Sequence, residues 1–340
     1  MSIVSGVFQA SFLRLRSPVA DAVPRTRLVA LDWGTTALRA YRFDGSGQVI
    51  DERHTDAGIM RITGGGDPAA GFARAFEAAC GDWLSASPGC AVLACGMVGS
   101  AQGWREAPYL EVPVGLEALA GALTEVAAPH DAVLHIIPGL LDRQGRLPDV
   151  LRGEETQVAG AIDRADPASG AETWFGLPGT HAKWIRVRER RIIGLRTFMT
   201  GEVFDALCGH TILGRTMRRP AAPDDRAFDR GVAVAGSPEA RAGVLSNAFS
   251  ARTLGLVGEL PGESQADYLS GLLIGHEIAA LGQLGPSPAS IVLIGRDDLC
   301  ARYHRALAAL GYTAAAIAAG ATERGLWRVA EAAGLVGVSR

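Results

Sequence analysis

Two short segments of this chain combine glycine, threonine and a charged side chain, as phosphate-binding turns require. The first runs from Asp32 to Thr36 (DWGTT) and the second from Gly179 to Lys183 (GTHAK). Glycine lets the backbone approach an anion closely, and hydroxyl and amide groups can donate hydrogen bonds to its oxygens. Asp32 adds a carboxylate that could hold Mg²⁺ directly or through water. The predicted phosphate-binding residues are Gly34, Thr35, Thr36, Gly179, Thr180, His181 and Lys183.

Either segment alone also fits an ordinary hairpin turn, and His181 also fits a hydrogen-bonded structural residue. The pair favours nucleotide binding, because each lies inside a strand–turn–strand–turn–strand pattern, and such a repeat indicates a duplicated fold unit. Two such turns facing each other across a cleft would hold opposite ends of a triphosphate. The sequence contains neither G-x-x-x-x-G-K-[ST] nor a G-x-G-x-x-G between a strand and a helix. Nucleotide binding therefore falls to the two turns.

Adjacent carboxylates at Glu154 and Glu155 are the predicted catalytic groups, together with Asp32. Phosphoryl transfer to an alcohol needs a carboxylate that orients or deprotonates the hydroxyl. The two glutamates follow Gly153 and precede an apolar helix, and their mutual repulsion could raise the pKa of one of them. They also fit a pair that complements a helix dipole. A further alternative makes Asp32 the base and the glutamates the metal ligands.

A glycine-rich turn that can expose backbone amides follows a predicted buried strand, 91–95. It combines these amides with polar side chains and with Arg105, which also fits a solvated loop. Glu202, in the segment 200–202, could reach ribose or metal. The predicted substrate-binding residues are Gly96, Met97, Gly99, Ser100, Trp104 and Arg105, and the predicted metal ligands are Asp32 and Glu202.

The elements that must position these residues repeat in the two halves of the chain. Turn signals and apolar runs predict two sets of three strands, at 28–32, 38–43 and 48–55, and at 173–177, 183–187 and 192–197. Further strands are expected at 91–95, 133–137 and 290–294. Apolar periodicity and capping residues predict helices at 68–84, 152–162, 203–213, 240–253, 264–281, 297–310 and 323–333. The polar segment 163–171 (DRADPASGA) is the predicted domain boundary.

Length and composition are those of a two-domain globular enzyme. The chain has 340 residues, of which 48% are apolar and 20% charged, and a formal net charge of −3. This charge gives no global attraction to nucleic acid or to anionic membranes, and no apolar run is long enough for a membrane span. Five cysteines without paired spacing argue against a disulfide framework, so we expect a reducing cytoplasm. Residues 1–27 do not fit the repeating pattern and are predicted to form a flexible extension.

Several longer strings together resemble the 2-dehydro-3-deoxygalactonokinase family. They are DWGTT, CGMVGSAQGWREAPYLEVP, IIPGL, LRGEETQ, GLPGTHAKW, FMTGEVFDALCGHTILG and DYLSGLLIGHEI, and the resemblance extends from Leu28 to about Ala333. RGEETQ and PGTHAKW are far more specific than the Asp-x-Gly-Thr-Thr turn. One departure stands near the C-terminus, where Ala319 occupies a position at which the family pattern suggests an acidic residue.

The resemblance implies an α/β fold of the actin/hexokinase type, with two ribonuclease-H-like domains closing on MgATP. The N-terminal domain, 28–165, would carry the first phosphate turn and the sugar-acid site. The C-terminal domain, 166–340, would carry the second turn and the adenosine site, with Gly295 and Arg296 at the adenine. The implied reaction transfers the γ-phosphoryl group of ATP to the 6-hydroxyl of 2-dehydro-3-deoxy-D-galactonate in galactonate or galactose catabolism.

Two other functions remain open from the residues alone. An exopolyphosphatase-like phosphohydrolase of the same superfamily would use the Gly-Glu-Glu turn to position water instead of a sugar hydroxyl. A non-catalytic nucleotide-binding protein of the same fold would bind ATP without turnover. The sequence does not separate galactonate-derived from gluconate-derived acids, and it is compatible with a homodimer without fixing the oligomeric state.

Overall fold

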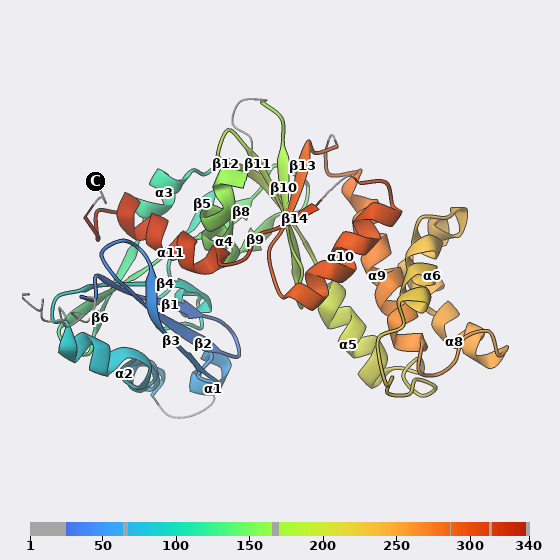
Figure 1. The fold of residues 1–340 in the computed structure, drawn as a ribbon, viewed down its shortest axis with the longest axis horizontal. Coiled ribbons are helices and arrows are strands. Elements are labelled where there is room, and N and C mark those ends of the chain that lie inside the picture. The colour runs from blue at the N-terminus through green and yellow to red at the C-terminus, as the bar shows by residue number, and fades with distance from the viewer. Residues whose placement is uncertain (1–24, 64–66, 165–169, 286, 313–314, 338–340) are drawn as a thin grey trace, which may run out of the picture.

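The computed structural model describes residues 25–63, 67–164, 170–285, 287–312 and 315–337. Two mixed β-sheets form its framework, one from each half of the chain, and helices pack around each (Figure 1). The predicted flexible extension lies outside the described residues except for its last three, and so does most of the segment proposed as the domain boundary. Among the described residues, no helix is both long enough and apolar enough to cross a membrane.

The N-terminal sheet has six strands in the order β3-β2-β1-β4-β7-β6. β1 pairs antiparallel with β2 and β2 antiparallel with β3, whereas β4 runs parallel to β1 and β7 parallel to β4. The strands are β1 (Leu28–Trp33), β2 (Leu38–Phe43), β3 (Val49–Thr55), β4 (Ala91–Gly96), β6 (Thr124–Ala128) and β7 (Ala132–Ile136).

The C-terminal sheet repeats this plan with the strand order β12-β11-β10-β13-β14. Here too β10 pairs antiparallel with β11 and β11 antiparallel with β12, whereas β13 runs parallel to β10 and β14 parallel to β13. The strands are β10 (Thr173–Leu177), β11 (Ala182–Arg188), β12 (Arg191–Phe198), β13 (Ser290–Leu293) and β14 (Ala315–Ile317). Both sheets therefore have the ribonuclease-H-like arrangement, and the predicted fold class is confirmed.

Helices cover both faces of the N-terminal sheet. They are α1 (Ile59–Thr63), α2 (Pro68–Ala86), α3 (Leu116–Ala120), α4 (Glu154–Ala161) and α11 (Ala321–Ala332), with short 3₁₀ turns η1 (Met97–Gly99) and η2 (Ile162–Arg164). α2 begins at its N-cap Asp67, whose carboxylate accepts from the Ala69 amide, and it buries Phe72 and Phe76 against one face.

The last helix of the chain returns to the N-terminal half, where α11 crosses α4 at two glycines. A Cβ at Gly160 would lie 1.8 Å from the carbonyl oxygen of Ala321, and one at Gly325 would lie 1.9 Å from that of Thr156. Only glycine allows the backbones to come this close. The domain boundary at residue 165 stays a prediction. α11 follows that boundary in sequence but packs against α4, which precedes it.

The helices of the C-terminal half form a cluster beyond its sheet (Figure 1). They are α5 (Thr200–His210), α6 (Asp225–Ala235), α7 (Val244–Ala248), α8 (Ser250–Leu256), α9 (Gln265–Leu281) and α10 (Asp297–Ala309), with the 3₁₀ turn η3 (Pro238–Ala242). The predicted helix 240–253 is wrong: η3, α7 and α8 replace it. Gly243 has φ +84°, which an α-helix does not tolerate, and it separates the first two.

A third sheet, with three strands in the order β5-β8-β9, lies against β12, where Asp142 and Asp149 accept from the amides of Leu195 and Thr197. Its strands, β5 (Tyr109–Glu111), β8 (Gly139–Asp142) and β9 (Asp149–Leu151), have three or four residues each. β9 leads directly into Arg152 and Gly153, and so into the helix that carries the two adjacent glutamates. This sheet was not predicted, although it positions that helix.

Candidate functional site

A cavity of about 770 Å³ lies between the two halves of the chain. Thr36 and Arg39 line it from the N-terminal sheet, and Gly179 and Thr180 line it from the C-terminal sheet. The two glycine–threonine turns therefore face one space, as the repeat predicts. Gly34 and Thr35 support the first turn from outside this lining, and the amide of Gly34 donates to Ala37 O at 2.9 Å.

The second turn rests against the first residues of α5. A Cβ on Gly201 would lie 2.5 Å from the carbonyl oxygen of Gly179 and 2.7 Å from the Cα of Thr180, so only glycine fits there. The Glu202 amide donates to Thr180 O at 3.0 Å. The helix thus begins at the turn, where its N-terminal amides and dipole favour an anion. His181 Nε2 and Glu202 Oε2 are 2.6 Å apart, and both side chains are half exposed.

Asp32 stands next to this cavity, at the end of β1. Its Oδ2 is 3.6 Å from Arg39 Nη1, and the Cys95 thiol lies 3.9 Å from its Oδ1. Burial raises the pKa of Asp32, Arg39 and Cys95 partly offset this, and the negative charge of Glu323 raises it further. Asp32 and Arg39 are paired directly across β1 and β2. The hairpin register alone could therefore have identified Arg39, which the sequence reasoning missed.

Glu154 lies within electrostatic reach of Asp32 and Lys183. Burial raises the pKa of Glu154, Lys183 lowers it and Asp32 raises it again. Its Oε2 accepts from the Arg152 amide at 3.1 Å. Lys183 is buried and donates to Thr197 Oγ1 at 2.9 Å. The structure therefore brings together three predicted residues from three elements, β1, α4 and β11.

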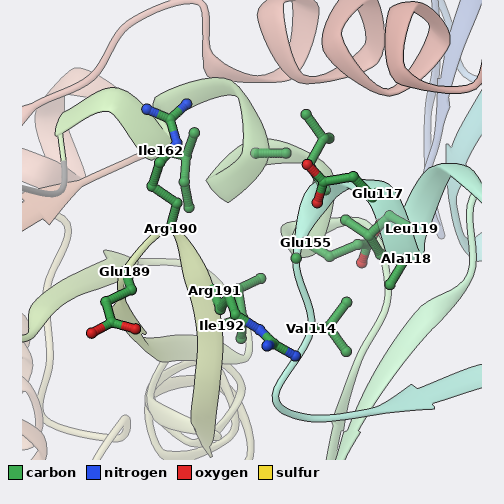
Figure 2. Close-up of a pocket in the computed structure, with 13 residues that line it drawn as sticks. Val114, Glu117, Ala118, Leu119, Glu155, Ile162, Glu189, Arg190, Arg191 and Ile192 are labelled. Atoms are coloured by element: carbon green, nitrogen blue, oxygen red, sulfur yellow. The ribbon is translucent and has the colours of Figure 1, made fainter. Parts of the chain in front are cut away.

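Glu155, the next residue, is packed into the protein interior. It is fully buried, and its carboxylate accepts from the Gly153 amide at 2.6 Å and from Thr156 Oγ1 at 2.9 Å. Burial, and then the charge of Glu154, raise the pKa of Glu155 to about 7. Figure 2 shows Glu155 among residues that line a second cavity, of about 550 Å³, together with Val114 and Ile192.

The backbone is unusually close beside Asp32. Gly96 has φ +90°, and a Cβ there would lie 2.8 Å from the carbonyl oxygen of Trp33 and 3.6 Å from Asp32 Oδ1. Gly153 has φ +110°, and a Cβ on it would lie 3.3 Å from the Cα of Gly96. The loop after β4 and the start of α4 therefore meet at two glycines, where the backbones pack too closely for larger side chains.

The other predicted substrate residues are placed in three ways. Met97, Gly99 and Ser100 belong to the turn that includes η1, and Ser100 is buried. Trp104 packs edge-on against Trp33 and Phe76 and stacks on Phe72. Arg105 is exposed. A cation that the sequence reasoning did not select, Arg152, is buried beside Gly99 instead.

The far end of the large cavity is lined from α5, α9 and α10. Arg296 lines it and pairs with Asp298, with Nη2 and Oδ2 2.5 Å apart; Gly295, with φ +156°, leads into this residue. Apolar side chains contribute Phe204, Leu273, Ile274 and Leu299. A flat aromatic base could lie among these groups, as predicted for adenine, although Arg296 is held in an ion pair.

A buried carboxylate, Glu277, supports this wall of the cavity. It accepts from Trp184 Nε1 at 2.7 Å and from Tyr303 OH at 2.8 Å, and it also bonds the hydroxyl of Thr200. Burial raises the pKa of Glu277 to about 7. Thr200 and Tyr303 both line the cavity. No local pattern indicates this contact, because Glu277 lies in a mostly apolar part of α9.

Comparison with known proteins assigns the chain to a family. The sequence profile described as 2-keto-3-deoxy-galactonokinase matches residues 32–329. The chain is 35% identical over 292 residues to 2-dehydro-3-deoxygalactonokinase of Escherichia coli (strain K12), which covers 86% of the chain and 93% of that protein. The chain belongs to the 2-keto-3-deoxy-galactonokinase family. It is therefore a phosphotransferase of the kinase type, as the resemblance implied.

Two further relatives agree with this family. One is a probable 2-dehydro-3-deoxygalactonokinase of Rhizobium meliloti (strain 1021), 36% identical over 85% of the chain and 91% of that protein. The other is the crystal structure of a candidate 2-dehydro-3-deoxygalactonokinase protein from Sinorhizobium meliloti, with a TM-score of 0.79 and 33% identity. It covers 90% of the chain and 98% of that structure. The family fold therefore extends over nearly all of this chain.

Metal binding in this kinase family member would depend on few protein ligands. Among the described residues, no group of three or more histidine, cysteine or acidic side chains is arranged to hold a metal ion. Mg²⁺ commonly keeps several waters and binds one or two carboxylates together with substrate phosphates. The charge of Asp32 contributes to the raised pKa of Glu154, so the two carboxylates are within electrostatic reach of each other. Oxygen donors of this kind fit Mg²⁺, whereas Glu202 is already bonded to His181.

Proposed function

We propose that the protein transfers the γ-phosphoryl group of ATP to the 6-hydroxyl of 2-dehydro-3-deoxy-D-galactonate. The observation that carries this proposal is the meeting of both glycine–threonine turns at one cavity, next to Asp32, Glu154 and Lys183. The family supports a kinase acting on a keto-deoxy sugar acid in galactonate catabolism, and the named acceptor is the finer step that we add. A cytoplasmic location stays a prediction.

The two turns would bind the phosphates from opposite sides. Thr36 offers a hydroxyl from the N-terminal sheet, whereas Gly179 and Thr180 offer backbone and hydroxyl groups beside the N-terminus of α5. Adenosine would extend along the far wall toward Arg296 and the apolar side chains. The phosphate chain would then end next to Asp32 and Glu154, where the reaction requires its γ-phosphoryl group.

We assign Glu154 as the base and Asp32 as the carboxylate on the nucleotide side. Asp32 lies near the end of β1, just before the first phosphate turn, so it would help to hold Mg²⁺, which neutralises phosphate charge when bound. Glu154 lies beside the glycines of the sugar-acid loop and would accept the proton of the 6-hydroxyl as the oxygen attacks phosphorus. A general base works best when its pKa is near the working pH. Burial raises the pKa of Glu154 and so moves it toward neutral pH.

A coupled ADP-release assay across 2-keto-3-deoxy sugar acids tests this function. We expect turnover with the galactonate-derived acid and little ATP hydrolysis in its absence. Equal turnover of the gluconate-derived acid would show that the proposed stereochemical preference is too narrow. Steady ATP hydrolysis without any acid would favour the phosphohydrolase, and ATP binding without turnover would favour a nucleotide-binding protein.

A further inference from the structure

Arg152 is a buried cation with no counter-ion among the described residues. It is 8% exposed, and its Nη2 donates to the carbonyl oxygen of Ala107 at 2.8 Å. Its Nε and Nη1 are buried and have no hydrogen-bond partner in the described part of the chain. A buried charge that lacks hydrogen bonds and a paired anion is strongly unfavourable, so buried arginines are normally paired. Two of the three guanidinium nitrogens of Arg152 are thus available to an anion.

The Ser100 hydroxyl is a second unpartnered donor in the same part of the fold. Ser100 is 9% exposed, and its Oγ is buried without a partner among the described residues. The residue before it, Gly99, touches the arginine, because a Cβ on Gly99 would lie 3.0 Å from Arg152 Nη1. The guanidinium thus lies against Gly99, and the hydroxyl belongs to the next residue of the same turn after β4.

We propose that Arg152 and Ser100 bind the carboxylate of the sugar-acid substrate, an inference that rests on the proposed kinase function. A carboxylate has two acceptor oxygens, and one of them could accept from Arg152 Nη1, a charged donor that stays protonated when buried. It would also accept from the Ser100 hydroxyl. Arg105, the cation expected from the sequence, is exposed and gives no such desolvated contact.

The position of Arg152 suits this role relative to the proposed base. Its backbone amide donates to Glu154 Oε2, while its guanidinium lies at the other end of the side chain, beside Gly99 and Ala107. The reacting hydroxyl and the carboxylate are likewise at opposite ends of a six-carbon acid. Tyr109 covers the guanidinium, with the Arg152 Cζ 4.3 Å from the ring centroid, and Tyr109 as a residue is 41% exposed. Rotation of this surface ring would open the guanidinium to a ligand.

The variants Ser100→Ala and Arg152→Lys test the inference. Ser100→Ala deletes a hydroxyl that has no partner, so a structural role predicts no loss of stability and no change in substrate binding. Our inference predicts an unchanged Tm together with a KM for the acid that rises about fivefold or more, while the KM for ATP stays constant. Arg152→Lys keeps the charge but removes Nη1 and the planar guanidinium, and should raise the KM for the acid by roughly ten- to a hundredfold. Arg143→Met, an exposed arginine in the turn between β8 and β9, is the control.

Calorimetric titration of each variant with 2-dehydro-3-deoxy-D-galactonate, in the absence of ATP, separates this inference from the proposed function. Weaker binding by both variants than by the wild type and Arg143→Met supports the inference, whether or not turnover is seen. Binding within twofold of the wild type in both variants overturns the inference, and so does a wild type that binds no acid. Failure of the function is a different result, namely wild-type binding of the acid without formation of ADP.

Discussion

The contact between α5 and the second phosphate turn should control ATP use, and Gly201→Ala tests this directly. A Cβ at residue 201 would meet Gly179 O at 2.5 Å, whereas ordinary contacts begin at 3.4 Å, so the turn must move by about 0.9 Å. Overpacking of this kind costs about 1–3 kcal/mol, which lowers the Tm by about 2–10 °C. A displacement of about 1 Å at a catalytic site can lower the rate by up to about 100-fold. We therefore expect kcat/KM for ATP to fall by about 10- to 100-fold.

Gly209→Ala is the matched control, since it makes the same change in the same helix. Gly209 is exposed and has open space around it, so alanine should increase the stability of α5 by up to about 1 kcal/mol. Steady-state kinetics at varied ATP, with the Tm of each variant, provide the comparison. If kcat/KM for ATP in Gly201→Ala stays within twofold of that in Gly209→Ala, the turn does not depend on this close contact and our reasoning is refuted.

Two further predictions concern the adjacent glutamates. Glu154→Gln should lower kcat by about 10²–10⁴-fold while the protein still folds, because it removes the proposed base. Glu155→Gln should keep most of the activity. Equal losses in both variants would contradict the assignment. Stability should fall as the pH rises through about 7, because burial raises the pKa of Glu155 and of Glu277 to about 7 in the folded state and favours their protonated forms. Tm values at pH 5 and pH 8 should show a smaller pH dependence in Glu155→Gln than in the wild type, and an unchanged dependence would count against this origin.

The two sheets could be predicted from the sequence because their strands are apolar runs separated by strong turn signals. β1 and β10 are buried along nearly their whole length, so their sequences read as continuous apolar segments. The Gly-Thr turns and the Asp-Gly-Ser-Gly turn then fix the hairpins. The family was also predictable, since its specific strings are contiguous in sequence.

The rest of the fold depends on contacts between distant segments, which local patterns do not encode. Strands as short as β5 and β9 carry too few residues for an alternating pattern, and they exist because they pair through β8. The predicted helix at 240–253 matched in composition, but Gly243 takes a positive φ. In the sequence, Arg152 is an arginine at the start of a predicted helix, where such residues are usually exposed. Its burial against Gly99 and Tyr109 in the structure makes it a candidate ligand-binding residue.

The adjacent glutamates illustrate why the base could not be chosen from sequence. Consecutive helical residues point about 100° apart, so one of the pair must face the core whenever the other faces a ligand. Glu155 is the buried one, and its carboxylate binds the amide of Gly153, the residue whose positive φ brings α4 against Gly96. The buried carboxylate thus fixes the backbone that presents Glu154 to Asp32 and Lys183. A glutamine at 155 would retain a carbonyl oxygen for that amide, which is why the two substitutions should differ in their effect on catalysis.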